Sequence, residues 1–154
     1  MNSPEQKQNR YKRLYRQSTD LISISPTIEA QMATINAIIY HKVSYIFWVG
    51  FYLIDIKRLT IGPYQGPLAC QVLEYPHGVC WQCIIQMKSI IVPDVSIFPG
   101  HIACDSRSKS ELAIPLQNHR NKIIGVFDID SDRLNAFDIN DQNGLEKIAG
   151  LLRY

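Results

Sequence analysis

The sequence of 154 residues lacks the features that mark membrane, secreted and nucleic-acid-binding proteins. It contains no run of about 18 apolar residues, which a membrane-spanning helix needs, and no apolar segment of a secretory signal near its start. Lysine and arginine number 16 against 14 aspartates and glutamates, whereas a dedicated nucleic-acid-binding domain is usually strongly basic. We therefore expect a cytoplasmic protein that binds neither membranes nor nucleic acids.

Internal repeats, low-complexity segments and linkers rich in proline, glycine or serine are also absent, so we predict one domain over residues 1–154. Hydrophobic residues make up 46% of the sequence, which is ample for a core. The positive charge is concentrated in residues 1–16, which carry a net +4, while the remainder carries −2. We interpret this basic start as the solvated face of a first helix.

Apolar residues at helical spacing predict four helices. The first begins at the start signal Ser3-Pro4-Glu5, and the second has Ser25 as its N-cap with Pro26 in the first helical position. The third spans residues 78–88, and the last runs from about Asp138 to Leu152. We expect the first and last helices to pack together on one face of the molecule.

An aromatic and β-branched run over residues 45–54 predicts a central strand that is covered on both sides. A turn over residues 55–58 leads into the next strand. The further predicted strands span residues 59–64, 71–73, 90–92, 112–116 and 122–130. Consecutive hairpins between terminal helices indicate an α+β fold with an antiparallel sheet.

The four cysteines are Cys70, Cys80, Cys83 and Cys104. Cys80 and Cys83 have the spacing of a redox dithiol or of half a zinc site, which His77 and His101 would complete. Cys83 also falls on the apolar stripe of the third helix, which favours a place in the core. Because Cys70 and Cys104 form no second paired motif, we predict no metal site.

Cys104 lies in a long irregular loop, residues 96–110, just after His101 and just before Asp105. Loops of this length inside a domain are usually functional or disordered. Arg107 nearby would lower the pKa of the Cys104 thiol, and Asp105 would raise it. The local sequence therefore leaves two interpretations, a reactive thiol or a loop cysteine without a role.

Two acidic residues, Asp128 and Asp130, follow an apolar run and point to the same face of a strand. Glu111, which opens the preceding strand, is able to join them across the hairpin. Three carboxylates in one pocket would favour a cationic group of a ligand. The alternative is that these residues are solvated at the strand end or cap turns.

Several segments together match one known pattern. They are Trp48-Val49-Gly50-Phe51-Tyr52, residues 62–70, Gly78-Val79-Cys80, Phe98-Pro99-Gly100-His101-Ile102-Ala103-Cys104-Asp105, residues 108–111 and residues 124–131. Three cysteines spaced 10 and 24 residues apart with this loop are a specific combination. The chain resembles the GAF-domain enzymes that reduce free methionine-(R)-sulfoxide, and the resemblance covers nearly its whole length.

This resemblance implies a fold and a sequence of thiol reactions. The fold is a GAF-like antiparallel sheet flanked by helices. Cys104 attacks the sulfoxide and becomes a sulfenic acid, Cys70 condenses with it to a disulfide, and thioredoxin restores both thiols without a bound cofactor. Cys80 matches a third, auxiliary cysteine. The pattern has neither Trp81 nor Cys83, and this indole either reshapes the helix start or narrows the pocket.

The resemblance also assigns roles to the three carboxyl groups. Asp130 is the acid that protonates the sulfoxide oxygen, while Asp128 and Glu111 hold the ammonium group of the substrate. Free methionine-(R)-sulfoxide, rather than protein-bound methionine, is the substrate that such an enclosed pocket selects.

Four further residues complete the expected site. Trp48 and Tyr52 form an aromatic wall for the methyl-sulfoxide end, and the backbone amides near Ile102 and Ala103 hold the carboxylate. GAF domains often pair through their terminal helices, so the resemblance is compatible with a homodimer. The competing hypothesis is a GAF-type sensor that binds a small molecule without turnover.

Overall fold

The computed structural model describes residues 3–152, so the ends of the predicted domain 1–154 lie outside the described residues. The helices are α1 (Pro4–Ile22), α2 (Ile28–Lys42), α3 (Gly78–Gln86) and α4 (Ile139–Ala149), with a short 3-10 helix η1 (Val95–Ile97). The strands are β1 (Trp48–Asp55), β2 (Arg58–Gln65), β3 (Val72–Glu74), β4 (Ile90–Val92), β5 (Ser110–Gln117) and β6 (Ile123–Ser131).

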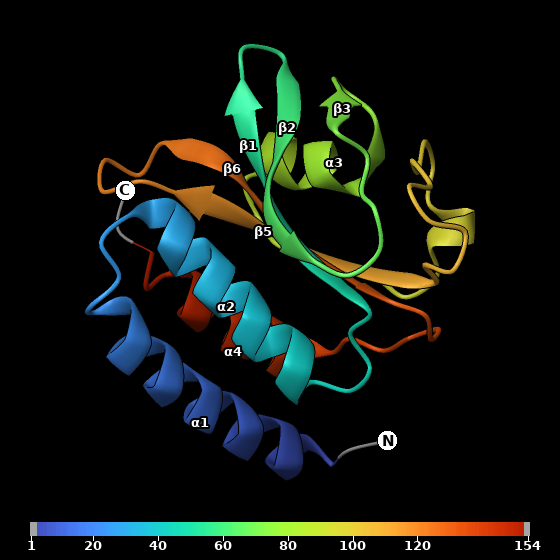
Figure 1. Cartoon of the computed structure of the whole chain (residues 1–154). Helices are drawn as coiled ribbons and strands as arrows, with labels where there is room; N and C mark the ends of the chain where they lie inside the picture. The colour runs from blue at the N-terminus through green and yellow to red at the C-terminus, as the bar shows by residue number, and fades with distance from the viewer. Residues whose placement is uncertain (1–2, 153–154) are drawn as a thin grey trace.

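The strands form one antiparallel sheet in the order β3-β2-β1-β6-β5-β4 (Figure 1). Helices α2 and α4 pack on one face of the sheet, and α1 packs on both of them. Helix α3 covers the other face. The α+β class and the contact between the first and last helices are thus confirmed. Within residues 3–152, no helix is both long and apolar enough to cross a bilayer.

Strand β1 divides its side chains between the two faces because successive residues of a strand point in opposite directions. Val49 and Phe51 lie in the core beneath α2 and α4, whereas Trp48 and Tyr52 lie in the cluster beneath α3. Neighbours on both sides, β2 and β6, confirm the central position of this strand. It begins at Trp48 rather than at residue 45, because Tyr45 and Ile46 precede the sheet and pack into the core.

The helix starts are partly as predicted. Ser3 caps α1 in a capping box with Gln6, and Asp138 caps α4.

The cap predicted for α2 was wrong: Thr27 accepts a hydrogen bond from the Ala30 amide, and the helix begins at Ile28. The Ser25 hydroxyl instead donates to the Leu21 carbonyl at 3.0 Å, so it completes the end of α1. Helix α4 ends at Ala149, before the predicted end.

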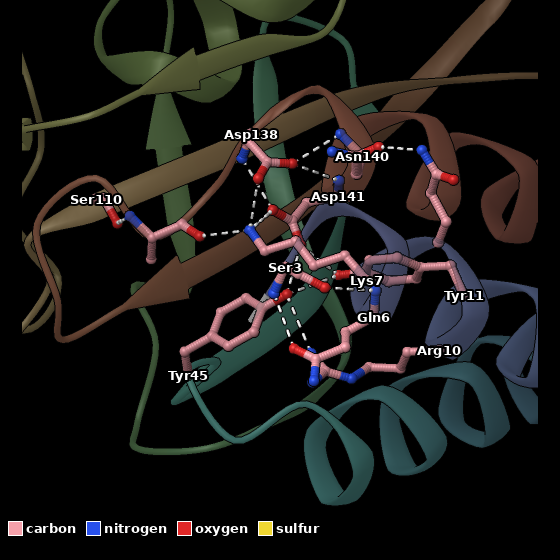
Figure 2. A network of polar contacts seen from close by, with 12 residues as sticks. Ser3, Gln6, Lys7, Arg10, Tyr11, Tyr45, Ser110, Asp138, Asn140 and Asp141 are labelled. Atoms are coloured by element: carbon pink, nitrogen blue, oxygen red, sulfur yellow. Dashed lines mark hydrogen bonds and ion pairs between the residues drawn. The ribbon is translucent and has the colours of Figure 1, made fainter. Parts of the chain in front are cut away.

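The expectation that every cation of α1 faces solvent was also wrong, because Lys7 is only 7% exposed. Its ammonium forms ion pairs with Asp141, which is fully buried, and with Asp138 at 2.9 Å (Figure 2). The hydroxyls of Tyr11 and Tyr45 both donate to the other Asp141 oxygen. Burial and then the Asp141 charge raise the pKa of Tyr11, which keeps its hydroxyl a donor.

The close approach of α1 and α4 at Gly144 gives a test of this packing. A Cβ atom at Gly144 would lie 2.2 Å from Cγ of Tyr11, whose hydroxyl is fixed by its bond to Asp141. We expect Gly144→Ala to lower the free energy of unfolding by about 1–3 kcal/mol, since the helices must move apart. Urea denaturation followed by tryptophan fluorescence measures this.

Gly150→Ala is the matched control, because the nearest neighbour of a Cβ there would be the Glu146 carbonyl oxygen at 3.4 Å, which is an ordinary contact, and the backbone φ is −66°. We expect its stability to stay within about 0.5 kcal/mol of the original. Equal stability of the two variants would contradict the proposed contact between the helices.

Candidate active site

A small cavity of about 50 Å³ lies on the α3 face of the sheet, between the sheet, α3 and the loop that follows η1. Eight of the ten predicted site residues line it. These are Trp48, Tyr52, Cys80, Ile102, Cys104, Glu111, Asp128 and Asp130. Cys70 is covalently bonded to one of them, whereas Ala103 is exposed and does not line the cavity.

The hairpin of β5 and β6 brings the three carboxyl groups together. Glu111 pairs with Asp130 in the register of the two strands, and Asp128 follows two residues away on the same face. Glu111 is 5% and Asp128 6% exposed, and neither lysine nor arginine is among the described residues that line the cavity. Burial, and then the charge of the neighbouring carboxylates, raises the pKa of all three groups.

Hydrogen bonds divide these carboxyl groups into a pair and a single group. The side chains of Glu111 and Asp128 are hydrogen-bonded to each other, which requires a proton on one of them. Asp130 instead accepts a hydrogen bond from the Ser108 hydroxyl. The second oxygen of Asp128, Oδ1, has no hydrogen-bond partner among the described residues. Their burial therefore favours the protonated forms of these carboxyl groups, and Oδ1 of Asp128 offers a free acceptor to a ligand.

The indole of Trp48 lies between two tyrosine rings. Its ring centroid is 6.0 Å from that of Tyr52 and 5.6 Å from that of Tyr64, and both pairs are stacked. A Cβ atom at Gly50 would lie 2.6 Å from the indole, so this position must stay small. The indole N–H of Trp48 is buried and has no acceptor among the described residues. The aromatic wall is thus rigid and retains one donor.

The loop that carries Cys104 is tied down across the mouth of the cavity. Cys104 forms a disulfide with Cys70, and the Tyr52 hydroxyl donates to the Cys70 carbonyl at 3.0 Å. Arg107 pairs with Asp105 at 2.6 Å and holds the pKa of that carboxyl at about 2. The two charges whose opposing effects on Cys104 the sequence left open therefore neutralise each other.

The remaining cysteines, Cys80 and Cys83, are buried free thiols. Cys83 is fully buried in the core, as predicted, and burial raises the pKa of both thiols. The Trp81 indole does not narrow the cavity, since it is buried and its N–H donates to the Leu73 carbonyl at 2.9 Å.

Sequence reasoning gave His101 and Ser108 no part in substrate chemistry, although both line the cavity. Nε2 of His101 lies 3.5 Å from Oε2 of Glu111, and burial lowers the pKa of this imidazole. Ser108 lies in a segment of the matched pattern, but only the fold shows that its hydroxyl reaches Asp130.

Within the described residues, one group of three side chains is close enough to share a metal ion. The Sγ of Cys80 and one oxygen each of Glu111 and Asp128 lie within 4.8 Å of one another. The zinc site considered from the sequence has a different composition, because it combined Cys80 with Cys83, His77 and His101.

Comparisons with known proteins identify a matching family and similar sequences. Residues 44–153 match the model of a family described as the GAF domain. GAF domain-containing protein A of Dictyostelium discoideum is 44% identical over 147 residues, which cover 95% of this chain and 92% of that protein. Free methionine-R-sulfoxide reductase of Escherichia coli K12 is 37% identical over 142 residues, which cover 92% and 86%.

A solved structure agrees with these sequence relatives. The X-ray structure of free methionine-R-sulfoxide reductase from Neisseria meningitidis, in complex with its substrate, matches with a TM-score of 0.90 at 34% identity. The match covers 99% of this chain and 89% of that chain. The similarity therefore extends beyond the sheet to the helices and the loops around the cavity.

The raised carboxyl pKa values predict how stability depends on pH. Above the unfolded-state pKa of about 4, the unfolded chain has lost these protons while the folded protein keeps them, so the free energy of unfolding falls as pH rises. We expect Asp128→Asn to make this fall between about pH 5 and 8 shallower, because it removes one of the groups whose pKa is raised in the folded protein. Urea denaturation of the disulfide-bonded protein at each pH measures it.

Asp105→Asn serves as the control, since the pKa of Asp105 is about 2 and its titration lies below this range. Its pH profile should have the same slope as the unsubstituted protein. A flat profile in the unsubstituted protein would contradict the raised pKa values.

Proposed function

Because this chain belongs to the GAF-domain family and is similar over most of its length to free methionine-R-sulfoxide reductases, we propose that it reduces free methionine-(R)-sulfoxide to methionine. One observation supports the proposal independently of this similarity. A disulfide-forming loop cysteine, Cys104, and a cluster of proton-holding carboxyl groups line the same small cavity. A reductase of this kind needs a thiol and an acid on opposite sides of one sulfur–oxygen bond.

In the proposed reaction the thiolate of Cys104 attacks the sulfoxide sulfur while Asp130 gives a proton to the oxygen. The oxygen passes to Cys104 as a sulfenic acid, and methionine leaves as a thioether. The thiol of Cys70 then displaces the sulfenic hydroxyl as water and forms the disulfide. The Ser108 hydrogen bond supports the role of Asp130, because it fixes one oxygen of that carboxyl.

We assign the substrate ammonium to Glu111 and Asp128. The absence of lysine and arginine from the described cavity lining, and the free Oδ1 of Asp128, support this assignment. Trp48 and Tyr52 enclose the methyl-sulfoxide end. The backbone amides near Ile102 and Ala103 hold the carboxylate, and Ile102 lies in the lining as this role requires.

Thioredoxin is the proposed reductant, and no bound cofactor is needed. A thiol of thioredoxin attacks the disulfide of Cys70 and Cys104, and its second thiol completes the exchange, so two electrons move per methionine formed. The cytoplasm is the expected location, because it keeps thioredoxin reduced. We also propose that two copies of the chain pair through their terminal helices.

The first test is turnover by the purified protein with thioredoxin, thioredoxin reductase and NADPH. We expect consumption of the R epimer of free methionine sulfoxide and none of the S epimer. Cys104→Ser should abolish turnover because the nucleophile is lost, whereas Cys83→Ser, in the core, should retain it. NADPH oxidation and chromatography of the amino acids provide the readout.

Cys70→Ser separates the two stages. It should form one methionine per chain and then stop, since the sulfenic acid has no resolving thiol unless Cys80 replaces it. Turnover that persists in Cys104→Ser would contradict the assignment. Ligand binding without turnover in the unsubstituted protein would favour the sensor hypothesis.

A second test addresses the carboxyl groups. Asp130→Asn is expected to lower kcat by about 10²–10⁴-fold with little change in KM, because an amide cannot give a proton to the oxygen. Asp128→Asn should instead raise KM more than it lowers kcat, since it removes a partner of the ammonium. Steady-state kinetics distinguish the two roles, and the opposite split would exchange them.

A further inference from the structure

Three different donor atoms converge at the floor of the cavity, on the α3 side. Cys80 comes from the first turn of α3, Glu111 from β5 and Asp128 from β6, and Sγ of Cys80 lies 4.0 Å from Oε1 of Glu111. All three side chains are more than nine-tenths buried. Three rigid elements thus hold a sulfur and two oxygens within 4.8 Å of one another.

One oxygen atom of this group is an acceptor without a partner. Oδ1 of Asp128 is buried without a hydrogen-bond partner, and neither lysine nor arginine lines the cavity to neutralise the carboxylates, within the part of the chain that the structure describes. A fourth donor is close, because Nε2 of His101 lies 3.5 Å from Oε2 of Glu111. Sulfur, carboxylate oxygen and imidazole nitrogen are the ligands that tetrahedral zinc prefers, whereas Mg²⁺ and Ca²⁺ prefer oxygen alone.

We propose that Cys80, Glu111 and Asp128 bind a divalent cation of the zinc class, which occupies the place of the substrate ammonium and so excludes the substrate. The metal is an inhibitory ligand and takes no part in the reaction. Binding releases the thiol proton of Cys80 and the proton shared by the two carboxyl groups to solvent. Only the competition with substrate rests on the proposed function, while metal binding itself rests on the donor geometry.

Cobalt is the probe, because Co²⁺ takes zinc sites and gives a thiolate-to-metal charge-transfer absorption in the near ultraviolet. The protein is used with the disulfide of Cys70 and Cys104 intact, so that only Cys80 and Cys83 remain as thiols. We expect one Co²⁺ per chain and a charge-transfer band. Cys80→Ser should lose the band, and the matched control Cys83→Ser should keep it.

Asp128→Asn provides a second variant that leaves the thiol in place, and it should weaken Co²⁺ binding at least tenfold. Circular dichroism checks that each variant is folded. No band in the unsubstituted protein, or a band that survives in Cys80→Ser, would overturn the proposal.

Free methionine separates this proposal from the proposed function. It should raise the apparent Kd of Co²⁺ in proportion to its concentration, as a competitor for one site does. A thiolate band with no effect of methionine would support the metal site and overturn the competition, while placing the amino-acid ammonium elsewhere. If the unsubstituted protein shows no turnover in the reductase assay, the proposed function fails, and the cobalt titration still tests metal binding.

Discussion

Three carboxyl groups in one buried space, with no lysine or arginine in the described lining, set the conditions for the rest of the site. Charged together they would repel and would lack water, so the fold favours their protonated forms. That preference costs stability as pH rises, and a binding site is the usual place where such a cost is found. The Cys104 loop and the aromatic wall are arranged around this cluster.

The two faces of the sheet carry different tasks. The face beneath α2 and α4 holds the large apolar core, which contains Phe51 and Phe127 stacked at 4.5 Å. The face beneath α3 holds the cavity, its carboxyl groups and its cysteines. Because alternate residues of β1 and β6 serve opposite faces, each strand contributes to stability and to chemistry at once. Burial of apolar side chains on the first face offsets the free energy that burial of the carboxyl groups costs on the second face.

The sequence predicted most strands and the shared face of Asp128 and Asp130, because both follow from a period of two. It misplaced the start of α2, since Ser25 and Thr27 are both good caps and only packing shows that Ser25 serves α1. It also placed Lys7 in solvent. Charge patterns along a helix do not show that an aspartate 134 residues away will meet one of the cations.

The candidate site divides in the same way. Residue type and spacing made the cysteines and carboxyl groups candidates, and only the family resemblance gave them roles. The strand register of β5 and β6 then brings Glu111 opposite Asp130. The bond from Ser108 to Asp130, the direction of the Trp81 indole and the proximity of Cys80 to Glu111 depend on loops and on a helix packed across the sheet. Such contacts have no periodic signature in a sequence.

The contact of Lys7 with Asp141 bears on where this fold can be cut. The family match begins at residue 44, yet α1 lies before it and supplies the ammonium and one of the two phenols around Asp141. Helix α2 also lies before it and supplies Met32, Ile35 and Ile39 to the core. A fragment that starts at the family boundary would keep the buried carboxylate of Asp141 and lose its counter-ion. The loss of one partner of a buried ion pair lowers the free energy of unfolding by about 3–5 kcal/mol. A fusion or recombination that transfers this domain must therefore include both helices.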